Sequence, residues 1–209
     1  MTENQLTGIA FIAGAYCLGA LPWSVILGKL FGKADLRTIG SGSTGSTNAL
    51  RAYGPKISIA VLVLDVAKGA APVVFARYLD LDWWWIGLGA VVAVVGHCWS
   101  PFLGFDGGKG VATGYGAAIA MYPWFALAVV AMAGIVYITR YVSLGSIVCA
   151  IAIAVMATIH SLAGDQHWQV TLAMIAVAGV IVWRHRENIA RLRAGKERTI
   201  SFRSPHPTS

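Results

Sequence analysis

The sequence contains few charged residues. Only 12% of its 209 residues are Asp, Glu, Lys or Arg, whereas a soluble domain carries about 25%. Hydrophobic residues make up 57% of the chain. This scarcity of charge excludes an ordinary soluble domain and predicts an integral membrane protein. At this length we expect a single membrane-embedded domain over residues 1–209, ending in a basic tail at about 184–209.

Cysteines and clustered metal ligands are also scarce. Cys17, Cys98 and Cys149 lie far apart in apolar runs, so we expect small core hydrophobes rather than a disulfide or a metal set. His, Asp and Glu do not gather with metal-ligand spacing. The sequence therefore predicts no metal and no cofactor.

Long apolar runs account for most of the chain. They cover residues 6–28, 57–79, 83–103, 111–139, 141–164 and 168–183, and a helix of about 20 residues spans the ~30 Å hydrocarbon core. The longest run contains Tyr122-Pro123. Proline disfavours helical geometry at the residue before it, so this run is expected to form two short helices. The sequence predicts an all-α, compact bundle of about seven transmembrane helices, some of them short.

The basic residues give this bundle a direction. Lys29, Lys33 and Arg37 follow the first run, and seven of the sixteen basic residues lie in 184–209. Because cytoplasmic ends are enriched in Lys and Arg, we expect the N-terminus outside and the C-terminus in the cytoplasm. The net charge of +7 then reflects topology, and no nucleic-acid partner is expected.

Three polar islands interrupt the apolar runs. The first island is residues 40–51 (GSGSTGSTNALR), the second is 104–110 (GFDGGKG) and the third is 183–192 (WRHRENIARL). With the predicted topology, all three lie at the cytoplasmic ends of their helices. We therefore expect them to meet at one face.

The first island has the composition of an anion site. Backbone N–H groups freed by glycines, followed by a helix start near Thr47, favour phosphate. The predicted phosphate-binding residues here are Ser41, Gly42, Thr47, Asn48 and Arg51. Capping of the helix by Thr47 and Asn48 is an alternative. A dinucleotide fingerprint is excluded, because a membrane helix, not a buried strand, precedes it.

The second island surrounds Lys109 with Gly107, Gly108 and Gly110. Lysine supplies a point charge for phosphate, and glycines let a ligand approach the backbone. The alternative is a loop lysine that only obeys the cytoplasmic enrichment of basic residues.

The third island places His185 and Asn188 three residues apart, on one helical face. Histidine could act as a base, an oxyanion donor or a phosphate ligand. Ser143 is a smaller polar point on the same side. Asp65 and Lys68 share one apolar run and can pair with each other, so we expect them to support the site.

The three islands together resemble a known family. SGSTGSTNALR, DGGKG and RHRENIARL, in this order and spacing, are similar to the motifs of the bacterial acyl-phosphate-dependent glycerol-3-phosphate acyltransferases, the PlsY family. Ser43 stands where that family usually has asparagine, and Ser46 where alanine is common. The resemblance covers the chain from about residue 21 to 197.

The resemblance implies a reaction and a place for it. An acyl group would pass from acyl phosphate to the 1-hydroxyl of sn-glycerol 3-phosphate, giving lysophosphatidate and inorganic phosphate. This first acylation of phospholipid synthesis would occur at the cytoplasmic side of the bacterial inner membrane. The implied partners are both substrates, membrane lipid and an upstream enzyme that forms acyl phosphate.

The resemblance also implies roles for the island residues. Lys109, His185 and Asn188 would be catalytic, with Ser143 and the glycines of the second island binding substrate. The base would be His185 or a phosphate oxygen of the substrate. The alternatives from other classes are a transporter or channel for a phosphorylated metabolite, and an acyltransferase that uses acyl-CoA or acyl carrier protein.

Overall fold

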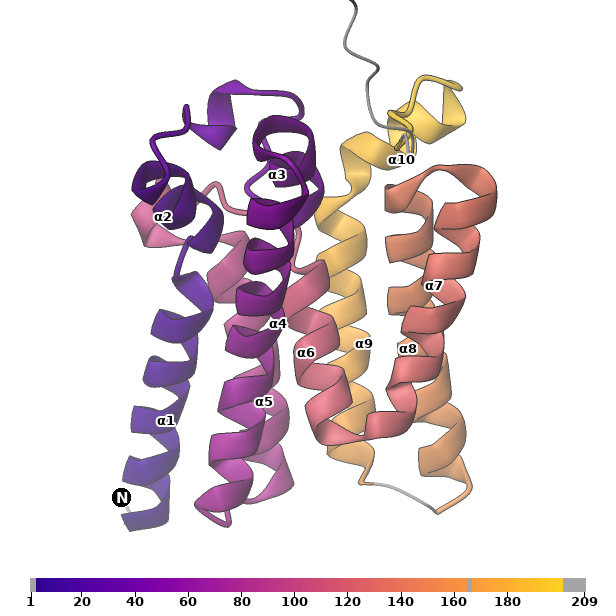
Figure 1. The fold of residues 1–209 in the computed structure, drawn as a ribbon. Coiled ribbons are helices and arrows are strands. Elements are labelled where there is room, and N and C mark those ends of the chain that lie inside the picture. Colours follow the sequence, from indigo (N-terminus) through magenta and orange to yellow (C-terminus); the bar gives the residue numbers. More distant parts are fainter. Residues whose placement is uncertain (1–2, 165–166, 201–209) are drawn as a thin grey trace, which may run out of the picture.

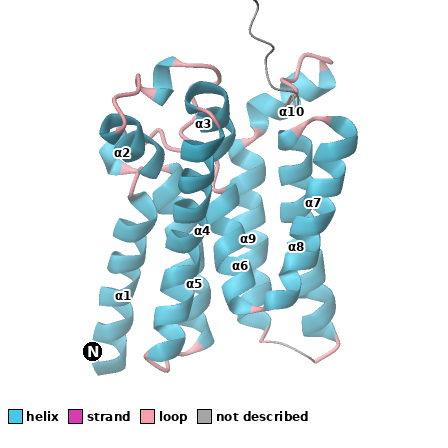
Figure 2. Ribbon diagram, in the orientation of Figure 1, coloured by secondary structure: helices cyan, strands magenta, loops and turns pink. Residues whose placement is uncertain are grey.

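A computed structural model describes residues 3–164 and 167–200, which form helices joined by short loops, with no strand in these ranges (Figure 2). The α-helices are α1 (Glu3–Ala20), α2 (Trp23–Leu30), α3 (Ser46–Tyr53), α4 (Pro55–Tyr78), α5 (Trp83–Cys98), α6 (Val111–Met121), α7 (Ala126–Thr139), α8 (Val142–Leu162), α9 (Trp168–Arg184) and α10 (Arg186–Arg193). Short 3-10 turns are η1 (Leu36–Thr38), η2 (Pro101–Leu103) and η3 (Pro123–Phe125). Residues 201–209 of the predicted basic tail lie outside the described residues.

The helices account for the predicted membrane bundle. Three segments are long and apolar enough to cross a membrane alone: α4, α5 with η2, and α8. Two further segments qualify as bent pairs, α1 with α2 (45°) and α9 with α10 (58°), and two shorter apolar helices correspond to α6 and to η3 with α7. The prediction of an all-α integral membrane bundle with some short helices is confirmed.

Prolines set two of the breaks. The predicted break at Tyr122-Pro123 is present, because α6 ends at Met121 and η3 begins at Pro123. The first apolar run, expected to continue over 6–28, is instead broken between α1 and α2. Pro22 lacks an N–H group and disfavours helix at the preceding residue. The carbonyl oxygen of Leu21 accepts a hydrogen bond from Lys68 Nζ at 2.7 Å.

Glycines bring helix backbones into direct contact. A Cβ at Gly69 of α4 would overlap the carbonyl oxygen of Thr113 on α6, and a Cβ at Gly116 of α6 would overlap the carbonyl oxygen of Val66 on α4. Small residues at such crossings permit the close packing that holds membrane helices together. The α4–α6 pair therefore forms a rigid wall in the middle of the bundle.

The cysteines follow this packing only in part. Cys98 and Cys149 are buried, as expected, but Cys17 is exposed. The expectation of a core position was wrong for Cys17, because an apolar side chain on a membrane helix can face lipid as readily as the core.

The islands lie at one end of the bundle. Figure 1 shows the N-terminus of α1 at one end and α2, α3 and α10 at the other. We call the end that carries α2, α3 and α10 the polar face. The first island forms α3 and its preceding loop, and the third island forms the turn from α9 into α10. The second island leads into α6 at the same end.

We expect Gly69→Ala to destabilise the protein, because the added methyl group would push α6 away from α4. Overpacking of this kind costs about 1–3 kcal/mol, which corresponds to several degrees in Tm. Gly134→Ala on α7 is the matched control, since nothing lies within 4 Å of its ideal Cβ. Thermal unfolding in detergent checks this, and an equal Tm for the two variants would contradict the packing.

Candidate functional site

A cavity of about 520 Å³ opens among the three islands at the polar face. Nine of the twelve residues predicted for the site line it: Ser41, Thr47, Asn48, Arg51, Lys109, Gly110, Ser143, His185 and Asn188. Gly42, Gly107 and Gly108 do not. Further in, the lining changes to apolar side chains of α4, α6 and α7, including Leu62, Val66, Ile119, Val129 and Met132.

Asn48 organises the loop of the first island from inside. Its side-chain amide donates to the carbonyl oxygens of Leu36 (3.1 Å), Ile39 (2.9 Å) and Ser43 (2.9 Å). Its Oδ1 accepts from the backbone N–H of Ser41 at 3.1 Å. Asn48 is only 2% exposed, so its polar groups are used within the protein. It shapes the cradle rather than offering a free amide to a ligand.

Two glycines give this cradle its curvature. Gly40 and Gly42 have φ of +62° and +71°, in the left-handed region that glycine adopts without strain. A Cβ at Gly40 would also overlap Oδ1 of Asn48. The helix α3 begins at Ser46, one residue before the predicted start. Its N-terminus and the exposed Arg51 therefore face the same cavity.

The second island is tied to the end of α5. The N–H groups of Gly107 and Gly108 donate to the carbonyl oxygens of Cys98 (3.0 Å) and His97 (3.1 Å). A Cβ on either glycine would overlap His97. The sequence predicted that these two glycines bind substrate, but their N–H groups are hydrogen-bonded to the end of α5. The two glycines therefore allow the close packing that positions Lys109.

Arg184 fixes the same loop from the other side. Its guanidinium donates to the carbonyl oxygens of Gly107 (2.8 Å) and Gly108 (3.1 Å) and pairs with Asp106 at 3.1 Å. The second island is thus held between α5 and the end of α9.

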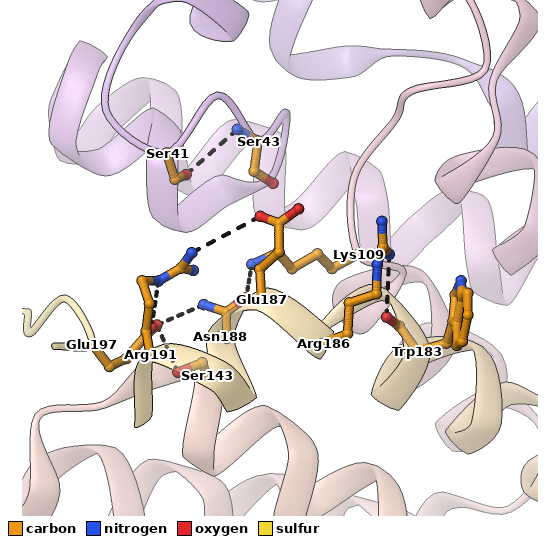
Figure 3. Close-up of polar contacts among 10 residues, drawn as sticks. All are labelled: Ser41, Ser43, Lys109, Ser143, Trp183, Arg186, Glu187, Asn188, Arg191 and Glu197. Carbon is orange, nitrogen blue, oxygen red and sulfur yellow. Dashed lines mark hydrogen bonds and ion pairs between the residues drawn. The ribbon is translucent and has the colours of Figure 1, made fainter. Parts of the chain in front are cut away.

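Lys109 points from this loop toward the third island. Its Nζ donates a hydrogen bond to Oδ1 of Asn188 (Figure 3). Burial, together with the nearby charge of Arg191, lowers the pKa of Lys109 from 10.5 to about 8. The ammonium is therefore charged at neutral pH, yet poorly solvated, and it gains free energy from an anion in the cavity.

Glu197 joins the last described segment to the cavity. Its Oε1 accepts from Ser143 Oγ (2.9 Å) and Asn188 Nδ2 (2.6 Å), and its Oε2 accepts from Arg191 Nε (2.8 Å; Figure 3). Burial raises the pKa of this carboxyl group, but the three hydrogen bonds outweigh burial and hold the pKa below its ordinary value. Ser143 and Asn188 are thus oriented by one carboxylate.

Sequence reasoning missed the part played by Glu197. The available signal was its isolation, since no other acidic residue follows Glu187 in a segment rich in arginine. Nothing in that segment indicates, however, that the chain turns back after α10 and returns the carboxylate to α8.

His185 lies between α9 and α10 and is 3% exposed. Its Nδ1 lies 2.7 Å from the carbonyl oxygen of Ile181, so Nδ1 carries the proton and Nε2 is left as an acceptor. Burial lowers the pKa of His185 to about 4. The imidazole is therefore neutral at physiological pH and can accept a proton or a hydrogen bond inside the cavity.

Asp65 and Lys68 pair as predicted, at 3.0 Å, with their side chains almost fully buried. His97 Nδ1 lies 3.7 Å from Asp65 Oδ1. Asp65 and His97 line the cavity, and Lys68 also holds the carbonyl group at the α1–α2 break. The pair thus links α4, α5 and the end of α1 beneath the second island.

Comparisons with known proteins show the family of this chain. Residues 9–195 match the sequence model of the family described as glycerol-3-phosphate acyltransferase. Curated relatives of that name include one from Anaeromyxobacter sp. (strain Fw109-5), 41% identical over 94% of this chain and 98% of the relative, and one from Geotalea daltonii, 42% identical over 90% and 95%.

Two solved structures share the fold. Crystal structures of PlsY, an integral membrane glycerol 3-phosphate acyltransferase, in its glycerol 3-phosphate and lysophosphatidic acid forms superpose with TM-scores of 0.86 and 0.84. Each is 36% identical and covers 93% of this chain and 96% of the solved chain. The chain therefore belongs to the PlsY family of glycerol-3-phosphate acyltransferases.

Proposed function

We propose that this protein transfers a fatty acyl group from acyl phosphate to the 1-hydroxyl of sn-glycerol 3-phosphate, yielding lysophosphatidate and inorganic phosphate. One observation carries the proposal. A single cavity joins a cationic, hydrogen-bonding end, with Arg51 and Lys109, to an apolar end lined by α4, α6 and α7. Such a cavity suits a donor with a phosphate head and a membrane-soluble tail, next to a small phosphorylated acceptor.

The polar end divides into contacting and positioning residues. Arg51 and Lys109 would neutralise the two phosphate groups, and Ser41 and Thr47 would donate to one of them. Asn48, Gly42, Gly107 and Gly108 would act by shaping the two loops. Gly110, at φ +78°, lets the chain turn from Lys109 into α6.

The acceptor would lie against the third island. Ser143 and Asn188 are fixed by Glu197, and Nε2 of His185 is an acceptor for a substrate hydroxyl group. These three side chains would orient glycerol 3-phosphate so that its 1-hydroxyl faces the acyl carbonyl carbon.

The chemical step needs little from the protein beyond position and charge. The 1-hydroxyl oxygen would attack the acyl carbonyl carbon, and Lys109 would stabilise the developing oxyanion. The bond between that carbon and the phosphate oxygen would then break. Phosphate would leave with its bonding electrons and take the hydroxyl proton. Acyl phosphate is already activated, so no covalent acyl-enzyme is required.

The predicted orientation belongs to the same proposal. The polar face would lie at the cytoplasmic side of the bacterial inner membrane, where glycerol 3-phosphate is supplied. An enzyme that forms acyl phosphate would act upstream. No cofactor or metal enters the proposed step, because cationic side chains carry the charge.

Phosphate release by the purified protein in lipid tests the proposal. With acyl phosphate, we expect release that depends on glycerol 3-phosphate and gives lysophosphatidate, falling at least about 100-fold in Lys109→Ala. Turnover with acyl-CoA or acyl carrier protein, but not with acyl phosphate, would show that acyl phosphate is not the donor. Binding of glycerol 3-phosphate without turnover would favour a transporter.

The activity should fall at alkaline pH. Because kcat/KM reports the free enzyme, we expect a basic limb near pH 8 in kcat/KM for glycerol 3-phosphate as Lys109 loses its proton. In Lys109→Arg the limb should move above the measured range, since arginine stays charged. A limb that stays near pH 8 in this variant would assign it to another group.

Glu197→Ala should lower both stability and activity. It leaves the donors of Ser143, Asn188 and Arg191 without their shared acceptor, which costs about 3 kcal/mol, or roughly 10 °C in Tm. Glu187→Ala is the matched control, because Glu187 reaches the same arginine only at 3.9 Å and is 74% exposed. Similar melting curves and rates for the two variants would contradict the role given to Glu197.

A further inference from the structure

The loop that carries Lys109 also presents two aromatic side chains to its surroundings. Phe102, in η2, is 62% exposed, and Phe105, two residues beyond η2, is 60% exposed. Neither belongs to a hydrophobic cluster formed by the described residues. Packing within the bundle therefore does not explain why these two positions carry aromatic side chains.

Phe105 is held outward by a strained backbone. Its φ is +64°, a left-handed conformation that is a genuine outlier for a bulky residue. The N–H groups of Leu103 and Phe105 both donate to the carbonyl oxygen of Ser100, at 3.0 and 2.8 Å. Ser100 Oγ in turn donates a hydrogen bond to the carbonyl oxygen of Ala20, at the end of α1, at 2.6 Å. A hydrogen-bonded turn thus fixes the backbone at Phe105. Backbone strain of this kind points to a functional role.

The length of α5 places this loop near the boundary of the hydrocarbon core. α5 has 16 residues and is about 24 Å long, whereas the hydrocarbon core is ~30 Å thick. Trp83 and Trp84 at its far end are typical interface anchors. Gly107 and Gly108 return the loop to the last turn of α5. The loop therefore lies at or slightly inside the boundary of the hydrocarbon core.

The neighbouring segment has matching chemistry. In Figure 1 the loop after α5 lies at the outer edge of the bundle, level with α2. α2 starts three residues after Ala20, the last residue of α1, to which Ser100 is hydrogen-bonded. It ends at exposed Leu30, which exposed Phe31 follows. Lys29 and Lys33 lie beside them in the sequence. Apolar side chains next to lysines fit a leaflet with anionic headgroups.

We propose that Phe102 and Phe105 insert into the acyl-chain region of the leaflet at the polar face, and so hold Lys109 at the depth where the head of a lipid-borne donor meets its chain. The partner is the lipid bilayer itself, and apolar insertion offsets the backbone strain at Phe105. The role of Lys109 toward the donor rests on the proposed function. The insertion does not.

A fluorophore on the loop tests insertion. Phe105→Cys, and separately Phe102→Cys, would be labelled with an environment-sensitive nitrobenzoxadiazole dye in a Cys17→Ala background and placed in vesicles of phosphatidylcholine and phosphatidylglycerol. Val130→Cys on α7 (69% exposed) is the lipid-facing control, and Thr38→Cys in η1 is the aqueous control. We expect blue-shifted emission, and quenching by a nitroxide on the upper acyl chain, close to that of Val130→Cys. Emission like that of Thr38→Cys at both positions would overturn insertion.

A kinetic comparison tests the consequence for the site. Phe105→Gly keeps the left-handed backbone and removes the anchor, whereas Phe105→Leu keeps an apolar side chain. We expect Phe105→Gly to raise KM for a long-chain acyl phosphate several-fold, with KM for glycerol 3-phosphate unchanged, and Phe105→Leu to restore it. Unchanged KM values in Phe105→Gly would refute the proposal that Phe105 positions Lys109. Absence of turnover in the wild type would count against the proposed function alone, because the fluorescence measurement tests insertion without relying on activity.

Discussion

Charge buried in an apolar bundle has to be paired, because an isolated buried ion costs several kcal/mol. This constraint governs the polar face. In the cavity wall, Asp65 pairs with Lys68. Glu197, in the same wall, accepts hydrogen bonds from Ser143, Asn188 and Arg191. Lys109 lies in the same cavity, and within residues 3–164 and 167–200 its ammonium donates a hydrogen bond only to the neutral amide of Asn188. The cavity is therefore arranged to receive an anion.

Backbone contacts turn this electrostatic arrangement into a fixed geometry. The second island is held by carbonyl groups of α5 on one side and by Arg184 on the other. The side-chain amide of Asn48 holds the loop of the first island through hydrogen bonds to three backbone carbonyl oxygens. The glycines matter mainly because they let these polar segments touch helix ends. Contacts within the protein hold both loops in place without a substrate, and preorganised charges of this kind are the ones that stabilise a developing oxyanion.

Much of the fold follows from the sequence, since apolar runs and the positions of basic residues define the spans and gather the islands at one end. Pro22 was the exception, because a proline inside an uncharged run does not reveal whether the helix bends or continues. In the site, the residue types at Lys109, His185 and Asn188 predicted a polar site, and all three side chains line the cavity. What the sequence could not show was which groups face each other: the N–H groups of Gly107 and Gly108 meet α5 rather than the cavity. Glu197 was missed because its partners are distant in the chain.

We infer that the three islands form one anion-binding site. A crystal or cryo-electron microscopy structure of this protein with glycerol 3-phosphate would test this inference. We expect phosphate density inside the cavity, contacted by Lys109 or Arg51 together with residues of the third island. Density confined to a single island, or found outside the cavity, would contradict it.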